Sequence, residues 1–240
     1  MKQAMKPVDW TRLSDDPNDS AAKIAVRDYL LSVRAVHAGS DLMEFIESLV
    51  SGKSVLDIGV VEHSARYFDQ PGWRHGRIAR LASRTLGVDI LEPLVKELNA
   101  RGFNVVCADA TSERDLGERF DVAFIGDVLE HVTDPTALLR FAARHLNPGG
   151  RVYATTPNPF SRKFYRRFRR EGTAMVNLDH VCWITPTQAL EIGRRAGSPL
   201  LAYHLVKRYS GSALALRRLA WKFAPLEWSF PDFLYEFGRA

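Results

Sequence analysis

Four short apolar runs constrain this chain most, because each ends in an aspartate or a glycine and is followed by polar residues. The runs span residues 54–59, 86–89, 105–109 and 122–127. Buried parallel strands read as unbroken apolar runs, and open α/β sheets bind ligands beyond the carboxyl ends of their strands. We therefore expect one sheet edge to carry Asp57, Asp89, Asp109 and Asp127 together. Carboxylates grouped there suit a ligand rich in hydroxyl and amino groups better than a bare phosphate.

Strand-like and helix-like segments alternate along the chain, which predicts an α/β fold with a parallel sheet and helical crossovers. Strands are expected near residues 54–59, 84–89, 103–108, 120–125, 150–156, 200–206 and 232–237. Helices are expected near residues 20–36, 41–49, 63–69, 74–82, 91–101, 134–146 and 186–196. The pattern breaks after Pro157, so residues 158–183 are interpreted as an insertion above the sheet.

A chain of 240 residues is long enough for one large domain with a full core. We expect residues 1–52 to form an arm and helices that pack on the core, and residues 53–240 to form the main domain. Hydrophobic residues make up 46% and charged residues 25%, which is typical of a soluble protein. The first ten residues lack the apolar core of a signal peptide, and one of only two cysteines lies in a predicted strand, so a reducing cytoplasm is expected.

Each strand end has its own chemical logic. Gly59 lets the chain pass close to a ligand where a side chain would collide. Asp89 can accept the hydroxyl protons of a ribose. Asp109 can accept from an adenine amino group, and the small Ala110 leaves room for the ring. The competing explanation is that each aspartate merely caps the following helix; for four of them in this order, it is the weaker one.

At this point the sequence resembles the class I S-adenosylmethionine (SAM)-dependent methyltransferases. The matching stretches are residues 55–59, 87–89, 108–110, 120–122, 127–132, 146–150 and 155–159. The resemblance implies a Rossmann-like sheet of seven mostly parallel strands with helices on both faces, the last strand being antiparallel. It also implies SAM as cofactor, with S-adenosylhomocysteine (SAH) as product. The cofactor-binding residues it implies are Asp57, Gly59, Asp89, Ile90, Asp109, Ala110, Gly126 and Asp127.

The first loop departs from the family pattern. Gly59 is followed by residues 60–64 without a second glycine, and the spacing from Asp57 to Asp89 is longer by about one short helix, which includes residues 70–75. Either the loop is rebuilt around the same cofactor, or binding is lost. Rebuilding is favoured because the other acidic positions are present.

Methyl transfer from a sulfonium needs no metal, so no metal site is expected, but a hydroxyl acceptor needs a base. Histidine is the natural base near neutral pH. His131 follows the fourth predicted strand directly, and His180 precedes the helix that begins near Thr185, where similar enzymes often face the acceptor. Glu130 is expected to orient a histidine or the acceptor. The structural alternatives are that His131 packs the next helix and that His180 pins the insertion.

Residues 160–170 alternate six cations with aromatic residues, and residues 214–223 form a second basic amphipathic stretch. The plain interpretation is a lid with solvated arginines. The sharper one is a site for an anionic acceptor, with Asn158, Arg162, Tyr165 and Arg166 as substrate-binding residues, or a surface for an anionic membrane. Nucleic acid is not expected, because the net charge of +5 is modest.

The chain also resembles, more loosely, bacterial methyltransferases of polysaccharide and glycolipid synthesis, through the loop at 57–64, residues 73–75 and residues 156–159. This resemblance implies O-methylation of a sugar hydroxyl on a glycan, nucleotide-linked or lipid-linked sugar. The expected location is the cytoplasm, with the two basic stretches favouring a peripheral place at the inner face of the membrane. The alternatives are a methyltransferase for a quinone-like or other small-molecule acceptor, and a degenerate fold that serves as a non-catalytic scaffold.

Overall fold

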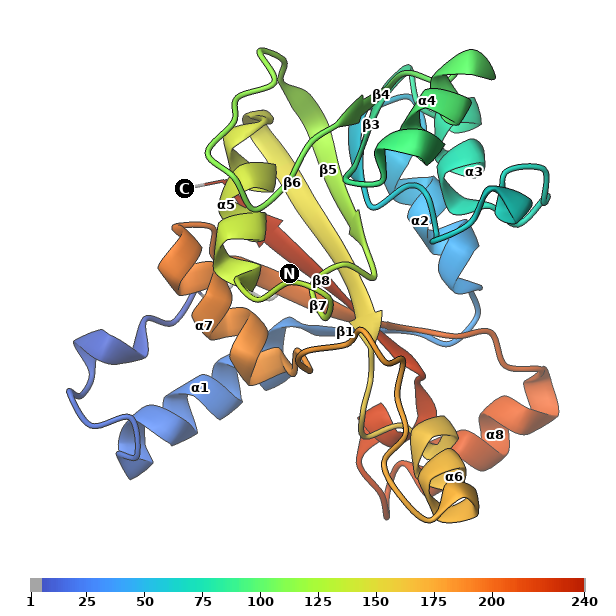
Figure 1. Ribbon diagram of the computed structural model, residues 1–240. Helices are drawn as coiled ribbons and strands as arrows, with labels where there is room; N and C mark the ends of the chain where they lie inside the picture. The colour runs from blue at the N-terminus through green and yellow to red at the C-terminus, as the bar shows by residue number, and fades with distance from the viewer. Residues whose placement is uncertain (1–5, 240) are drawn as a thin grey trace.

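A central sheet separates two layers of helices in the computed structural model, which describes residues 6–239 (Figure 1). The strands are β1 (Arg34–His37), β2 (Ser54–Ile58), β3 (Arg84–Asp89), β4 (Val105–Cys107), β5 (Phe120–Gly126), β6 (Leu146–Pro157), β7 (Leu200–Val206) and β8 (Asp232–Gly238). Their order is β1-β7-β8-β6-β5-β2-β3-β4. All neighbouring strands are parallel except β8, which runs antiparallel to β6 and β7. The predicted α/β sheet with an antiparallel last strand is confirmed.

The sheet has eight strands, one more than predicted. Helix α1 (Ser20–Val33) ends before Val36, and residues 34–37 form β1, which pairs in parallel with β7. The backbone turns extended at Arg34, with ψ 122°. Residues 34–37 continue the helical periodicity of α1, so the local pattern gave no sign of the strand; pairing with β7 decides its conformation.

Most of the remaining helices lie close to the predicted positions, and the two at residues 162–171 and 211–220 overlap the basic stretches, for which no helix bounds were predicted. These helices are α2 (Leu42–Val50), α3 (Arg74–Leu81), α4 (Glu92–Ala100), α5 (Pro135–Arg144), α6 (Arg162–Glu171), α7 (Pro186–Ala196) and α8 (Gly211–Ala220). Three short 3₁₀ turns cover Trp10–Arg12, Ala65–Tyr67 and Leu226–Ser229. Capping explains several starts: the Thr185 side chain and Gln188 form a capping box at α7. The helix predicted at 63–69 is only the middle 3₁₀ turn.

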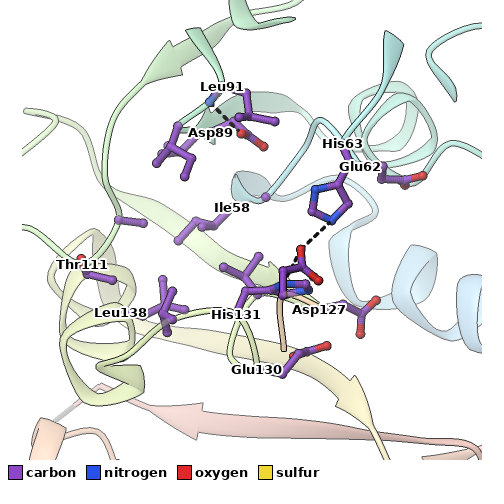
Figure 2. Close-up of a pocket in the computed structure, with 18 of the residues that line it drawn as sticks. Ile58, Glu62, His63, Asp89, Leu91, Thr111, Asp127, Glu130, His131 and Leu138 are labelled. Carbon is purple, nitrogen blue, oxygen red and sulfur yellow. Dashed lines mark hydrogen bonds and ion pairs between the residues drawn. The ribbon is translucent and has the colours of Figure 1, made fainter. Parts of the chain in front are cut away.

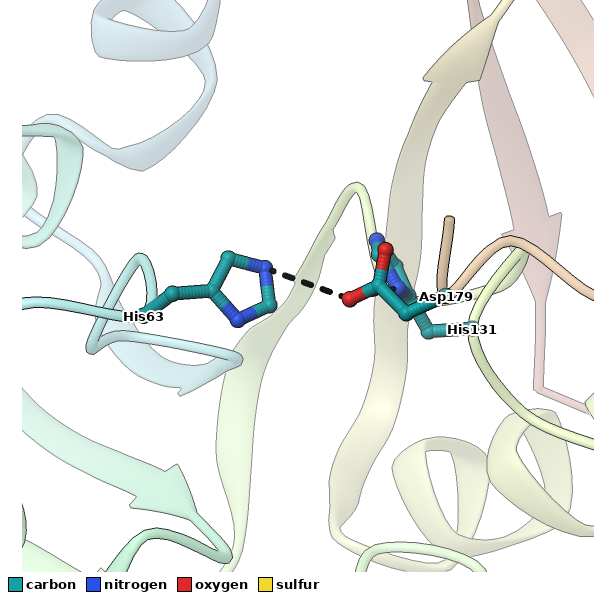
Figure 3. A group of neighbouring side chains, drawn as sticks. All are labelled: His63, His131 and Asp179. Atoms are coloured by element: carbon teal, nitrogen blue, oxygen red, sulfur yellow. Dashed lines mark ion pairs between the residues drawn. The ribbon is translucent and has the colours of Figure 1, made fainter. Parts of the chain in front are cut away.

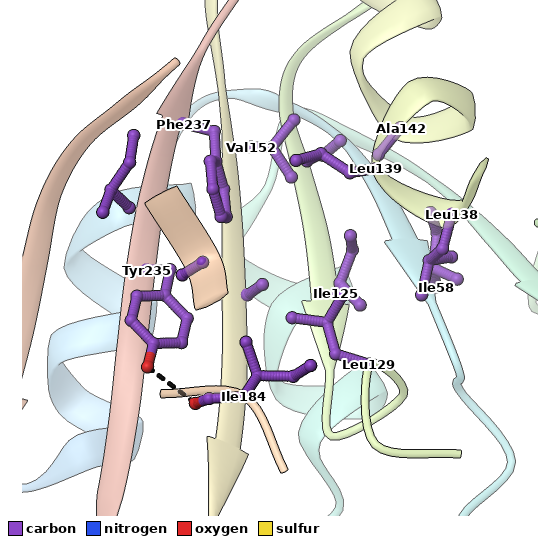
Figure 4. Close-up of a cluster of buried hydrophobic side chains, with 14 of the residues drawn as sticks. Ile58, Ile125, Leu129, Leu138, Leu139, Ala142, Val152, Ile184, Tyr235 and Phe237 are labelled. Carbon is purple, nitrogen blue, oxygen red and sulfur yellow. Dashed lines mark hydrogen bonds between the residues drawn. The ribbon is translucent and has the colours of Figure 1, made fainter. Parts of the chain in front are cut away.

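Helices α1, α5 and α7 cover one face of the sheet, and α2, α3 and α4 cover the other (Figure 1). Figure 4 shows Leu138, Leu139 and Ala142 of α5 beside Ile125 and Val152 of the sheet, all fully buried. Burying each large aliphatic side chain stabilises the fold by about 1.5–3 kcal/mol. The sheet is therefore a rigid base for residues at its edge.

Buried hydrogen bonds tie the flanking segments to the sheet. The Tyr29 hydroxyl of α1 donates to the Leu200 carbonyl at 2.5 Å, and the Tyr235 hydroxyl donates to the Ile184 carbonyl at 2.8 Å (Figure 4).

Residues 1–5 of the predicted arm lie outside the described residues. Helices α6 and α8 project together from one end of the molecule (Figure 1). Cys107 and Cys182 are both free thiols. Within residues 6–239, every helix is too short or too polar to cross a bilayer.

Candidate active site

A cavity of about 850 Å³ opens at the carboxyl ends of β2, β3, β5 and β6 (Figure 2). This volume lies within the usual range for small-molecule sites. All of the predicted cofactor residues except Asp57 line it. These are Gly59, Asp89, Ile90, Asp109, Ala110, Gly126 and Asp127. All three predicted catalytic residues, Glu130, His131 and His180, line the same cavity.

The Asp89 carboxylate is held by two backbone amides. Val61 N donates to Oδ2 at 3.0 Å, and Leu91 N donates to Oδ1 at 3.1 Å (Figure 2). A carboxylate has about four acceptor positions, so each oxygen keeps capacity for a further donor. The orientation of Asp89 is therefore fixed while it can still accept two adjacent ribose hydroxyls.

Asp109 follows β4 and is anchored in its own turn. Its Oδ1 accepts from the Thr111 hydroxyl at 2.6 Å and from Thr111 N at 2.7 Å, and these hydrogen bonds lower the pKa of the carboxyl. The group is thus ionised at neutral pH and stays an acceptor, as an adenine amino group requires. Ala110 beside it is buried.

The rebuilt first loop makes its turn without a second glycine. Gly59 has φ +82°, and a Cβ on it would lie 2.3 Å from Cγ2 of Val128, so only glycine fits there. Glu62 and His63 adopt the left-handed conformation themselves, with φ 52° and 63°. Such residues cost about 1–2 kcal/mol each relative to right-handed backbone.

The inserted segment at residues 70–75 braces this loop from below. Trp73 Nε1 donates to the Val60 carbonyl at 2.9 Å, and His75 Nδ1 lies 2.8 Å from Oδ2 of Asp57. Asp57 is fully buried against His75 and does not line the cavity, so its expected place in the cofactor site is wrong. The Asp57 side chain lies within β2 and is directed toward His75 of α3 instead of the cavity.

Three histidines and an aspartate lie close together along the cavity. His131 Nδ1 lies 3.2 Å from Oδ2 of Asp179, and His63 Nε2 lies 3.8 Å from the same oxygen (Figure 3). The insertion reaches this point because Val181 N donates to the Glu130 carbonyl at 2.8 Å. Asp179 thus partners His131.

His180 is placed for proton transfer. Its ring centroid lies 4.6 Å from that of His131 in an edge-to-face arrangement. Its Nδ1 is buried without a hydrogen-bond partner in the described part of the chain. Burial and the neighbouring His131 lower the pKa of His180, so the imidazole is neutral near pH 7 and has a free nitrogen to accept a proton.

Glu130 is fully buried, and neither carboxyl oxygen has a hydrogen-bond partner among residues 6–239. Burial, with a smaller contribution from the Asp127 carboxylate, raises the pKa of Glu130 to about 8. The group is therefore protonated at neutral pH and can donate to a bound molecule.

Two sets of side chains here are compact enough to share a cation. One is His63, His131 and Asp179, and the other is Glu130, His131 and His180. Within each set the ligand atoms lie within 4.8 Å of one another. Imidazole and carboxylate groups suit several divalent transition metals. The expectation of a metal-free site stays a prediction.

The predicted substrate residues lie away from the cavity. Asn158 is fully buried, and its amide donates to the Glu227 and Phe230 carbonyls at 2.8 Å each, so it fixes the start of the insertion. Arg162, Tyr165 and Arg166 belong to α6 and do not line the cavity. The sequence placed them there because the insertion follows β6, but α6 projects outward.

Arg74 and Asp232 also line the cavity, although the sequence analysis did not single them out as site residues. Arg74 begins α3, and Asp232 begins β8 opposite Pro157. Burial and Asp127 raise the pKa of Asp232 to about 6. The unusual segment at residues 70–75 was a signal for Arg74, but Asp232 comes from the antiparallel strand, whose amino end shares this edge. No motif marks it.

The donor set fits a nucleoside with an amino-acid tail. Asp89 and Asp109 offer hydrogen-bond acceptor oxygens at one end. At the other end lies Arg74, whose buried Nε has no hydrogen-bond partner within residues 6–239. A cation with unused donors suits the binding of an anionic group.

Comparison with known proteins agrees with this geometry. A family model described as a methyltransferase domain matches residues 33–202. A ubiquinone biosynthesis O-methyltransferase of Aeromonas salmonicida is 30% identical over 162 residues, covering 61% of this chain and 63% of that protein. A ubiquinone biosynthesis O-methyltransferase of Pseudomonas fluorescens is 33% identical over 116 residues, covering 45% of this chain and 46% of that protein. The matches thus span less than two thirds of these relatives' length.

Solved structures show the same fold. The CcbJ methyltransferase of Streptomyces caelestis has a TM-score of 0.57 at 15% identity, covering 82% of this chain and 88% of that one. A SAM-dependent methyltransferase of Archaeoglobus fulgidus has a TM-score of 0.55 at 18% identity, covering 81% and 93%. From the family match, the fold and the cavity together, this chain belongs to the class I SAM-dependent methyltransferases, with SAM as its cofactor.

Proposed function

We propose that this methyltransferase acts on a hydroxyl group of a small, ring-bearing acceptor. The observation that carries the proposal is His180, which lines the same cavity as Asp89 and Asp109 and whose buried Nδ1 has no hydrogen-bond partner among residues 6–239. A hydroxyl must lose its proton as its oxygen is methylated, and a neutral histidine beside it can take that proton.

Different residues of the cavity would bind the cofactor and act on the acceptor. Asp89 would hold the ribose hydroxyls of the cofactor and Asp109 its adenine amino group. SAM supplies a methyl group on a positively charged sulfur when it is bound. His180 accepts the hydroxyl proton, and protonated Glu130 donates a hydrogen bond to a carbonyl or hydroxyl oxygen of the acceptor. The pair of His131 and Asp179 borders His180 and limits how its ring can turn.

A quinone-like or phenolic acceptor is favoured. The curated relatives named for ubiquinone biosynthesis are O-methyltransferases, which supports an acceptor of that class. A sugar hydroxyl is the second candidate. It rested on the looser resemblance to methyltransferases of polysaccharide and glycolipid synthesis, which the comparisons do not support. Arg162 and Arg166, expected to bind an anionic acceptor, do not line the cavity.

A direct assay tests this proposal. The purified chain is incubated with SAM and, separately, with a catechol-type acid, a hydroquinone and a nucleotide-linked sugar, and the products are analysed by mass spectrometry. We expect a mass gain of one methyl group on a phenolic oxygen. Methylation of the sugar alone would overturn the phenolic acceptor, and methylation only on nitrogen would overturn O-methylation.

We also propose that α6 and α8 contact an anionic membrane. Helix α6 carries five arginines and one lysine with a single glutamate, and α8 carries Arg217 and Arg218. Large apolar side chains stand exposed beside these cations: Phe223 is 84% and Leu216 71% exposed, and Phe160 is also exposed. The cations can pair with anionic headgroups, and the exposed apolar side chains between them can insert at the boundary with the acyl chains.

A further inference from the structure

Arg74 lies at the floor of the cavity, on the first turn of α3. Its Nη2 donates to the Gly59 carbonyl at 2.7 Å, and its side chain is only 13% exposed. A Cβ on Gly126 would lie 2.1 Å from the Arg74 Cζ. The bare glycine thus makes room for the guanidinium between the ends of β2 and β5, which are neighbours in the sheet.

Most donors of this guanidinium are not used by the protein. Nε is buried and has no hydrogen-bond partner in the described chain, and Nη1 is 3.8 Å from Oδ2 of Asp127. A guanidinium has five N–H donors, and buried donors left unpaired cost free energy. The protein therefore holds a cation that is ready for an additional anionic partner.

Asp127 faces Arg74 from the end of β5 in a strained conformation. Its φ is 52°, in the left-handed region that non-glycine residues rarely adopt. Its backbone N donates to the Thr155 hydroxyl at 3.1 Å and to the Thr155 carbonyl at 3.3 Å, which holds this conformation. Strained backbone of this kind concentrates at ligand sites, where it aims a side chain. The Asp127 carboxylate is half exposed and lines the cavity.

We propose that Arg74 and Asp127 form a clamp for the zwitterionic amino-acid end of the cofactor. The guanidinium would bind the α-carboxylate, and the Asp127 carboxylate would bind the α-ammonium. The planar fork of an arginine matches a carboxylate in two parallel hydrogen bonds, and an aspartate pairs with an ammonium as a charge-assisted acceptor.

The sheet order supports this orientation. The sequence β5-β2-β3-β4 puts Gly126 and Gly59 side by side and puts Asp89 and Asp109 progressively farther away. If the adenosine lies against Asp89 and Asp109, its amino-acid tail extends toward Arg74. The inference rests on that placement of the cofactor. It also explains the inserted segment, because residues 73–75 both brace the altered loop and deliver the cation.

Binding of three matched ligands tests the clamp. SAH carries both charged groups, its decarboxylated analogue keeps only the ammonium, and 5′-methylthioadenosine lacks the whole amino-acid end. By calorimetry we expect Arg74→Met to weaken SAH at least tenfold, as loss of a charged hydrogen bond does, and to change the other two less than threefold. Asp127→Asn should weaken SAH and the decarboxylated analogue but not 5′-methylthioadenosine.

Arg77→Met is the matched control. Arg77 lies one turn further along α3 and pairs with Glu47 at 2.7 Å outside the cavity, so SAH affinity should stay within twofold. If Arg74→Met weakens SAH and 5′-methylthioadenosine equally, or leaves SAH unchanged, the clamp is wrong and Arg74 only braces the loop.

The unmodified protein gives an independent check if Arg74→Met fails to fold. It should bind SAH at least tenfold more tightly than the decarboxylated analogue, and equal affinities would overturn the clamp. If the unmodified protein bound neither SAH nor 5′-methylthioadenosine, the cofactor cavity itself would be contradicted. Failure of the clamp and failure of the cofactor site therefore give different results.

Discussion

His75 and Asp57 form a buried pair directly beneath the first loop of the cofactor site. Nδ1 of His75 lies 2.8 Å from Oδ2 of Asp57, and the two side chains are 1% and 0% exposed. Asp57 belongs to β2 and His75 to the inserted helix, so the pair locks the insertion to the sheet. It also explains why the loop above can hold its shape with fewer glycines.

Removing one member of this pair should destabilise the fold strongly. Asp57→Ala leaves a buried imidazole nitrogen without its hydrogen-bond partner, and such losses cost about 1–3 kcal/mol. Urea unfolding measures the free energy. Asp28→Ala, an exposed aspartate on α1, is the control and should change it by about 0.5 kcal/mol or less. Equal effects of the two substitutions would show that the pair adds nothing to stability.

His180→Ala should reduce kcat by about 100-fold or more, because a positioned general base contributes at least that much. SAH affinity should not change. In the unmodified enzyme, activity should rise with pH through a pKa below the usual 6.5 and then level off, because burial first and His131 second lower the pKa of the base. His37→Gln, in an imidazole pair at the far side of the sheet, is the control. Full turnover of His180→Ala would remove this residue from the mechanism.

Glu130→Gln should change how stability depends on pH. The pKa of Glu130 is raised from 4.5 to about 8 in the folded state, mainly by burial. Between these values the folded protein keeps a proton that the unfolded chain has released, so stability falls as pH rises toward 8. The contribution is up to about 5 kcal/mol.

Glu130→Gln lacks this titration, so its stability relative to the unmodified protein should increase from pH 5 to pH 8.5. Unfolding curves at both values measure the difference. Glu92→Gln, an exposed glutamate on α4, should follow the unmodified protein. Parallel pH profiles for Glu130→Gln would mean that Glu130 ionises normally.

Replacing Arg166, Arg167, Arg169 and Arg170 by glutamine should abolish sedimentation with vesicles that contain anionic lipid, while neutral vesicles bind neither form. Each cation near such a surface contributes about 1 kcal/mol. The control variant replaces Arg12, Arg27, Arg80 and Arg140 by glutamine, which removes the same charge from exposed sites outside α6 and α8. It should still sediment with the anionic vesicles. Equal loss in both variants would show that only net charge matters.

The sequence was enough to predict the sheet edge, because unbroken apolar runs mark buried parallel strands wherever they occur. Asp89, Asp109 and Gly126 follow such runs and line the cavity as expected. Strand β1 was missed, since a short edge strand with exposed Val36 has no alternation to mark it. Its pairing with β7 is a tertiary contact between distant segments.

The rest of the site depends on side-chain direction, which periodicity does not encode. Asp57 has the family's position but points to His75 beneath the sheet edge. Arg162 and Arg166 lie on the insertion, but their helix projects away from the cavity. Arg74 was hidden because its role appears only when α3 folds back against Gly59 and Gly126.

Calorimetry of SAH binding to the unmodified protein and to Asp89→Ala tests the central claim most directly. The unmodified protein should bind SAH, and Asp89→Ala should bind it more than tenfold more weakly, a loss of about 1.4 kcal/mol or more. Asp89→Asn keeps an acceptor oxygen and should lose less, which separates contact with the ligand from support of Val61. Equal SAH affinity in all three proteins would contradict the placement of the cofactor in this cavity.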